Sequence, residues 1–140
     1  MNGAEIRAGL DTSVLMRLLV GQPERLAESA CAFLAEVEEA GAKVLVSNLV
    51  VAEAYFACQH HYHMPKGVVL SGIRELLSKS TFVVQPALLE LLSRDDVASS
   101  KPGFIDRLIH SEYAAHDIPL VTFEKAGNRL SGTRVLDAPD

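Results

Sequence analysis

The sequence has no excess of basic residues, no apolar run of membrane length and no set of paired cysteines. Its 13 Lys and Arg residues against 18 Asp and Glu residues give a net charge of −5, whereas a nucleic-acid-binding protein is usually basic. No stretch approaches the ~20 apolar residues that cross a bilayer. These absences argue against a membrane protein, and the charge alone does not predict a nucleic-acid partner.

The beginning of the chain and its two cysteines predict a cytoplasmic protein. The first ten residues lack the basic start and the long apolar centre of a signal peptide. Cys31 and Cys58 form no CxxC motif, and both lie in segments with helical spacing. We therefore expect two small buried side chains in a reducing compartment and no disulfide framework.

The length of 140 residues and a hydrophobic fraction of 49% predict one domain over residues 1–140, with a core that buries roughly two-thirds of the unfolded surface. Short apolar runs alternate with helical patterns. Strands are predicted at 6–10, 43–46, 81–84, 120–122 and 133–136. Helices are predicted at 12–20, between Pro23 and Gly41, from the cap at 47–48 to about 61, from Pro65 to 77, and at 86–92, 104–116 and 124–130. This alternation predicts an α/β fold with a mostly parallel central sheet and helices on both faces.

Four acidic residues stand beside apolar segments that are far apart in the chain. They are Asp11, Glu53, Asp106 and Glu124. A carboxylate next to a hydrophobic core is costly unless a charge compensates it. Asp11 and Glu124 follow predicted strands, and ligands bind where the carboxyl ends of parallel strands meet. The pattern therefore predicts that the fold gathers the four acids around one cation.

The helical neighbours of Glu53 make it the sharpest of the four predictions. Leu49, Val50, Phe56 and Ala57 lie three or four residues away and are all apolar, so Glu53 projects from a face that we expect to be packed. A buried ion pair with an arginine is the alternative explanation.

The other three acids also have ordinary structural explanations. Asp11 is a good N-cap residue for the helix that follows it. Asp106 and Glu124 are each acids in the first turn of a predicted helix, where a negative charge is favourable. These alternatives stay open at the level of the sequence.

The residue types indicate which metal such a site would prefer. Carboxylates without His or Cys partners favour Mg²⁺ or Mn²⁺ over Zn²⁺. Such an ion polarises a phosphoryl oxygen and lowers the pKa of a bound water. The histidines at 60, 61 and 63 are a second candidate cluster, but their place near a helix end explains them as well.

The sequence resembles the PIN domain family in the order and spacing of four segments. They are LDTSVLMRLL, LVVAEAYF, FIDRLIHSEYAAHDIPL and VTFEK. The closest type is the VapC-like toxin of VapBC type II toxin–antitoxin pairs, and the resemblance covers essentially the whole chain. It implies a three-layer α/β/α sandwich and a Mg²⁺- or Mn²⁺-dependent ribonuclease. It also implies an RNA substrate, a cognate antitoxin protein and a homodimer. The metal-binding and catalytic acids carried over are Asp11, Glu53, Asp106 and Glu124, with Ser13 and Thr122 as supporting hydroxyls.

Two positions depart from the pattern of the family. Glu124 stands where the family commonly has Asp, and Gly103 stands where many relatives have a further acid. The alternative function is therefore a PIN-like RNA- or protein-binding module with a weakened metal site. A receiver-type phosphoacceptor ranks lower, because the first predicted strand is followed by DTS and not by an acidic pair.

The basic residues nearest to the acids in sequence are candidates for phosphate contacts. They are Arg17, Lys101, Arg107, Lys125 and Arg129. Solvated surface charge is the alternative for each of them. The apolar helices around 26–37 and 68–77 carry more apolar surface than a small sheet needs, which favours a dimer.

Overall fold

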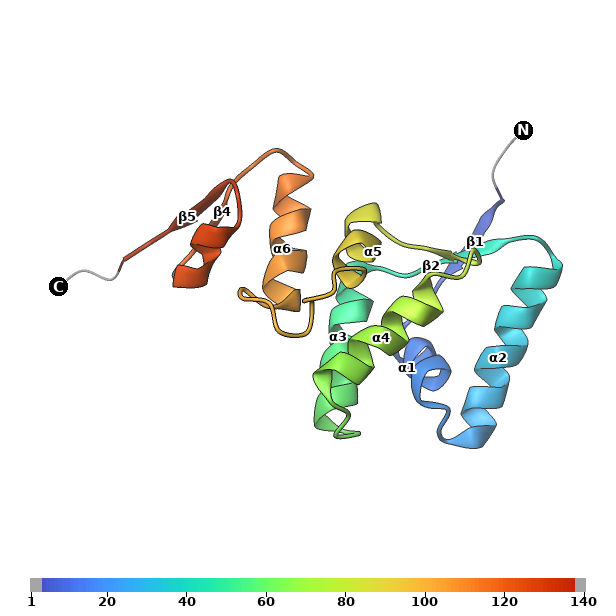
Figure 1. Cartoon of the computed structure of the whole chain (residues 1–140). Coiled ribbons are helices and arrows are strands. Elements are labelled where there is room, and N and C mark those ends of the chain that lie inside the picture. The colour runs from blue at the N-terminus through green and yellow to red at the C-terminus, as the bar shows by residue number, and fades with distance from the viewer. Residues whose placement is uncertain (1–3, 138–140) are drawn as a thin grey trace.

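The computed structural model describes residues 4–137 as short parallel strands that alternate with helices (Figure 1). The first part contains β1 (Ile6–Gly9), α1 (Thr12–Val20), α2 (Glu24–Glu39), β2 (Lys43–Leu45), α3 (Asn48–His60), α4 (Lys66–Leu77), β3 (Phe82–Val83) and α5 (Pro86–Leu92). The second part contains α6 (Phe104–Ala114), β4 (Leu120–Thr122), the 3₁₀ helix η1 (Lys125–Arg129) and β5 (Thr133–Val135). The α/β class is confirmed, and each predicted element is present with ends that lie within one or two residues of the prediction.

Local capping explains several of these ends. The Ser47 side chain accepts a hydrogen bond from the Val50 amide at 3.2 Å, which satisfies a free donor at the start of α3. Gly21 ends α1 in the left-handed conformation, with φ 78°, and its amide bonds to the Arg17 carbonyl at 2.9 Å. These signals are local, so the sequence alone predicts them.

The strands form two separate parallel sheets and not the single sheet that we predicted. One sheet has the order β1-β2-β3, and β4 pairs with β5 in the other. Within the described residues, β1 therefore has one free edge and β4 has another. Figure 1 shows the β4–β5 pair at one end of the molecule, with α5 and α6 between it and β1. The strands of residues 4–137 therefore do not form one continuous sheet.

The position of α6 explains why the second sheet lies apart. Phe104, at the start of α6, is only 2% exposed, and its ring lies 5.1 Å from the ring of Tyr55 on α3. Leu108 is buried one turn later. The side-chain amide of Asn48 on α3 donates a hydrogen bond to the Glu112 carboxylate at 3.0 Å. These contacts hold α6 against α3 and α5, so β4 continues from the side of α6 that faces away from β1 (Figure 1).

One hydrophobic core joins β2 to the surrounding helices. Its fully buried members include Leu15 of α1, Val44 of β2, Val51 of α3, Ile73 of α4 and Leu88 of α5. Burial of this many aliphatic side chains is the main stabilising term of the fold.

The cysteines match the prediction only in part. Cys58 is buried in the core, as expected. Cys31 is exposed on α2, so the prediction that it is buried was wrong. The two thiols are free. Among residues 4–137, no helix combines the length and the apolar character that crossing a bilayer demands.

Candidate metal site

The first pair of acids lies where β1 ends and α1 packs against α3. Asp11 occupies the N-cap position of α1 in an extended conformation, but its side chain makes no capping hydrogen bond. Ser13 Oγ instead donates to Asp11 Oδ2 at 3.1 Å. Asp11 is thus the N-cap residue by position, as the alternative explanation states, although its carboxylate does not bond to the helix amides. The carboxylate is exposed, and its orientation is set by the serine that we predicted to support the site.

Glu53 lies close to this end of α1, but its surroundings differ from the prediction. The side chain is exposed because the buried stripe of α3 runs through other positions, and within residues 4–137 it forms no ion pair with an arginine. Of the apolar neighbours of Glu53, Leu49 is 72% exposed and Phe56 is exposed as well, whereas Val50 and Ala57 are partly buried and pack against the core. Thr12 Oγ1 donates to Glu53 Oε1 at 2.7 Å and connects α3 to the first turn of α1.

The second pair of acids lies between α6 and the end of β4. Asp106 and Glu124 line one small cleft of about 120 Å³ together with Thr122. The Glu124 amide donates to Thr122 Oγ1 at 3.0 Å, which holds the backbone directly after the strand. Thr122 thus contacts the backbone of Glu124, whereas Ser13 contacts the carboxylate of Asp11.

Gly127 allows η1 to lie close enough to β4 to form this cleft. It is buried, and a Cβ atom at this position would lie 2.9 Å from Thr122 Cγ2 and 3.1 Å from Thr133 Cγ2. Any larger side chain would push η1 away from β4 and β5. The glycine thus determines the position of Glu124, which immediately precedes η1.

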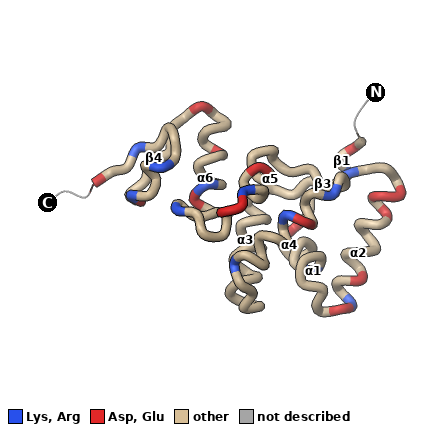
Figure 2. The backbone as a smooth tube through the Cα atoms, viewed as in Figure 1, with Lys and Arg blue, Asp and Glu red and all other residues tan. Residues whose placement is uncertain are grey.

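The structure brings the four acids together as two pairs and not as the single cluster that the sequence predicts. Within residues 4–137, no group of three or more His, Cys, Asp or Glu side chains has a geometry that could hold a metal ion. Figure 2 shows the acidic residues spread over both parts of the molecule. Asp106 lies on α6 and Glu124 directly after β4, whereas Asp11 precedes α1 and Glu53 lies on α3.

The donor atoms of each pair still fit a hard cation. The first pair offers two carboxylates with the hydroxyls of Thr12 and Ser13, and the second offers two carboxylates with the hydroxyl of Thr122. Oxygen donors of this kind suit Mg²⁺ or Mn²⁺, which keep several waters. The sequence favoured Ser13 and Thr122 over Thr12 as supporting hydroxyls, whereas in the structure Thr12 is the residue that donates to Glu53. The position of Thr12 next to Asp11 at the start of a helix was the feature of the sequence that could have identified it as a hydroxyl of the site.

The three histidines near the end of α3 do not make a second metal site among the described residues. His60 stacks on Phe56, with ring centroids 6.2 Å apart, and all three side chains are exposed. Their place at and beyond the helix end agrees with the structural explanation.

Comparisons with known proteins do not assign the chain to a family. No protein family matches the sequence, and no curated protein or solved structure is significantly similar to it.

Proposed function

We propose that this chain is a Mg²⁺- or Mn²⁺-dependent ribonuclease of the PIN-domain toxin type, similar to VapC. The observation that carries the proposal is the repeated arrangement of the acids. Asp11 and Glu124 each stand two residues beyond a parallel strand, and each is paired with a second exposed carboxylate and a hydroxyl group. Ligand sites of α/β proteins lie at this end of the strands.

In the active form that we propose, β4 adds to the free edge of β1 in parallel orientation. Parallel strands are normally covered on both faces, and an isolated two-stranded sheet has little stability of its own. Ile6 of β1 is 51% exposed and Val121 of β4 is 53% exposed, so both strands have apolar surface to bury. The addition would give one continuous sheet, as in the PIN-like sandwich, and would bring Glu124 beside Asp11.

Each of these residues would then have a distinct role in phosphodiester hydrolysis. Asp11 and Asp106 would hold the ion, with Glu53 and Glu124 as further oxygen ligands. A divalent ion at this place supplies a water of lowered pKa and neutralises charge on the phosphoryl oxygens. The proteins that the sequence resembles leave a 5′-phosphate and a 3′-hydroxyl, and no side-chain nucleophile is needed.

The surface beside Asp11 supports a protein partner. A largely apolar cleft of about 480 Å³ lies between α1 and α2, with Ser13, Val14, Arg17 and Phe33 among its lining residues. A cognate antitoxin in the cytoplasm could insert an apolar side chain there and cover the first pair of acids.

The proposal predicts RNA cleavage that depends on a divalent metal. The purified chain should cleave single-stranded or structured RNA in Mg²⁺ or Mn²⁺ and should be inactive in EDTA, because carboxylates alone neither activate water nor neutralise the phosphate. Gel electrophoresis of labelled RNAs, with analysis of the 5′ and 3′ ends of the products, checks this prediction. Equal cleavage in EDTA would refute the metal mechanism.

The alternative is a PIN-like module that binds RNA or protein through a weakened metal site. Gly103 and Glu124 depart from the family pattern, and the described structure separates the two pairs of acids. The same assay separates the two functions, since a binding module would retain the RNA without Mn²⁺-dependent cleavage.

We also predict a homodimer in solution. Leu26 of α2 and Val68 of α4 are exposed, and they lie in the two helices whose apolar surface suggested a dimer. Burial of such residues favours association by about 25 cal/mol per Å² of apolar surface before the cost of association. Light scattering at tens of micromolar should give the dimer mass, and a strictly monomeric mass would contradict the prediction.

A further inference from the structure

A basic cleft lies between α5, α6 and η1, and neither the proposed metal chemistry nor the core accounts for it. Its volume is about 490 Å³. The charged and titratable side chains that line it are Glu90, Arg94, Arg107, His110 and Arg129. Three arginines therefore share one concave surface with a single carboxylate, although the chain as a whole is acidic.

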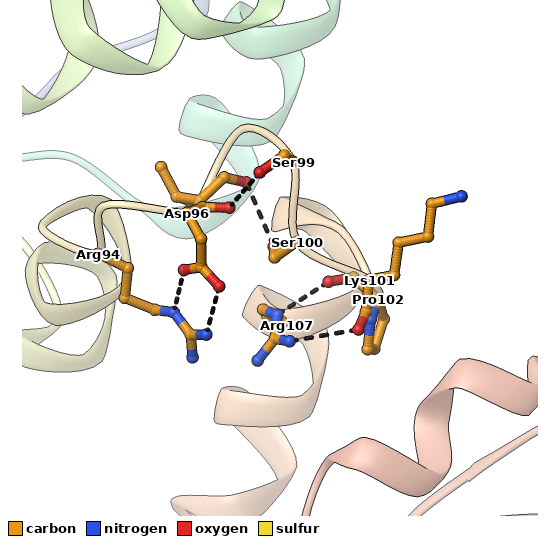
Figure 3. A network of polar contacts seen from close by, with 8 residues as sticks. Arg94, Asp96, Ser99, Ser100, Lys101, Pro102 and Arg107 are labelled. Carbon is orange, nitrogen blue, oxygen red and sulfur yellow. Dashed lines mark hydrogen bonds and ion pairs between the residues drawn. The ribbon is translucent and has the colours of Figure 1, made fainter.

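Backbone carbonyl groups hold two of these arginines in place. Arg107 Nε donates to the Pro102 carbonyl at 2.8 Å, and Arg107 Nη2 donates to the Lys101 carbonyl at 3.4 Å (Figure 3). Arg129 Nη1 donates to the same Lys101 carbonyl at 3.2 Å. The two guanidinium groups thus converge on one loop from α6 and from η1.

The cleft leaves much of this positive charge without compensation. Arg94 forms a two-point ion pair with Asp96, at 3.0 and 3.1 Å, whereas neither Arg107 nor Arg129 has an acidic partner among residues 4–137. Partial burial lowers the pKa of Arg107, and the positive charges of Arg94 and Arg129 lower it further, against the opposing effect of Asp96. An anion in the cleft would relieve this repulsion.

The cleft is next to the second pair of acids. Leu130 lines both the basic cleft and the small cleft that contains Asp106 and Glu124. Asp106 and Arg107 are consecutive on α6, so one helix supplies a residue to each cleft. A chain of phosphates that passes Asp106 would therefore reach Arg107 within a short distance.

We propose that this cleft binds backbone phosphates of single-stranded RNA, with Arg107 and Arg129 as the main contacts and Arg94 and His110 beside them. The planar guanidinium group offers paired donors that match phosphate oxygens. The choice of RNA as the ligand rests on the proposed ribonuclease function, because the adjoining acids would act on the same strand. Of the five basic residues suggested by the sequence, these two line the cleft, whereas Arg17 instead donates to the Tyr62 hydroxyl at 3.3 Å.

The test measures RNA binding without catalysis. Fluorescence anisotropy of a short labelled single-stranded RNA is recorded in EDTA over a range of salt concentrations, with the full chain as wild type, Arg107→Gln and Arg129→Gln. Each substitution should weaken binding several-fold and reduce the slope of log affinity against log salt by about 0.7 for each lost phosphate contact. Arg25→Gln on α2 is the matched control, since Arg25 is exposed and lies outside the cleft, and it should bind as wild type does.

The outcomes separate this inference from the ribonuclease proposal. Arg129 is exposed, so its variant stays informative even if Arg107→Gln melts early. Unchanged affinity and salt slope in Arg129→Gln and in a folded Arg107→Gln would overturn the inference, and so would binding of a polyglutamate peptide but not of RNA. Arginine-dependent binding with no Mn²⁺-dependent cleavage would refute only the ribonuclease. Cleavage together with RNA binding that does not depend on either arginine would refute only the proposal that this cleft binds RNA.

Discussion

Replacement of Asp11 or Asp106 by asparagine is expected to reduce Mn²⁺-dependent RNA cleavage by more than about 100-fold. Loss of groups that merely orient metal ligands costs about 10- to 100-fold, and loss of a ligand should cost more. Asparagine keeps the volume of the side chain, and both positions are exposed, so the free energy of unfolding should change by no more than about 0.5 kcal/mol. Cleavage rates under single-turnover conditions and thermal melts of the same preparations measure both effects.

The metal dependence of the melting temperature shows whether the two pairs act as one site. An ion that binds only the folded chain stabilises it by about 2.7 kcal/mol at a hundredfold excess over its dissociation constant. If β4 adds to β1, each single variant should lose nearly all of this gain. If each variant keeps a gain from the other pair, the acids form two separate sites and the proposed closure is wrong. Glu28→Gln, an exposed acid on α2, is the control and should retain both the gain and the activity.

Replacement of Phe104 by alanine is expected to lower the free energy of unfolding by about 3–5 kcal/mol, the usual cost of removing a buried aromatic ring. Phe104 is 2% exposed, and its contact with Tyr55 attaches α6 to the core. The change would also loosen the helix that carries Asp106 and Arg107. Urea unfolding followed by circular dichroism measures the loss.

Phe123 provides the matched control for this prediction. It carries the same side chain but is 69% exposed after β4, so Phe123→Ala should change the free energy of unfolding by no more than about 0.5 kcal/mol. Equal losses for the two variants would mean that Phe104 does not anchor α6 as the structure indicates.

The secondary structure was predictable because its signals are local. The spacing of apolar residues in α1 and α4, the Ser47 cap and the αL glycine at position 21 each act within a few residues of the chain. The hydroxyl groups that support the acids were also predictable in part. Ser13 contacts Asp11 and Thr122 contacts the Glu124 amide, because each hydroxyl lies two residues from its partner in sequence.

The face of α3 that packs on the core was not predictable from the sequence of the helix alone. Its residues are apolar on nearly all sides, so periodicity does not distinguish the stripe through Val51, Ala54 and Cys58 from the face that carries Leu49 and Glu53. The contacts of α3 with α1 and α4 determine which face of the helix is buried. Glu53 is exposed for this reason.

The sequence by itself determined the alternation of strands and helices, the parallel direction of the strands, and four carboxylates beside apolar segments as candidate oxygen ligands. Only the tertiary structure decided that these carboxylates lie in two pairs, that β4 and β5 form their own sheet, and that Arg107 and Arg129 meet in one cleft. The physical reason is the range of the interactions. Periodicity and capping depend on neighbours along the chain, whereas the partner of a strand and the position of α6 depend on the burial of Phe104 against residues more than forty positions away.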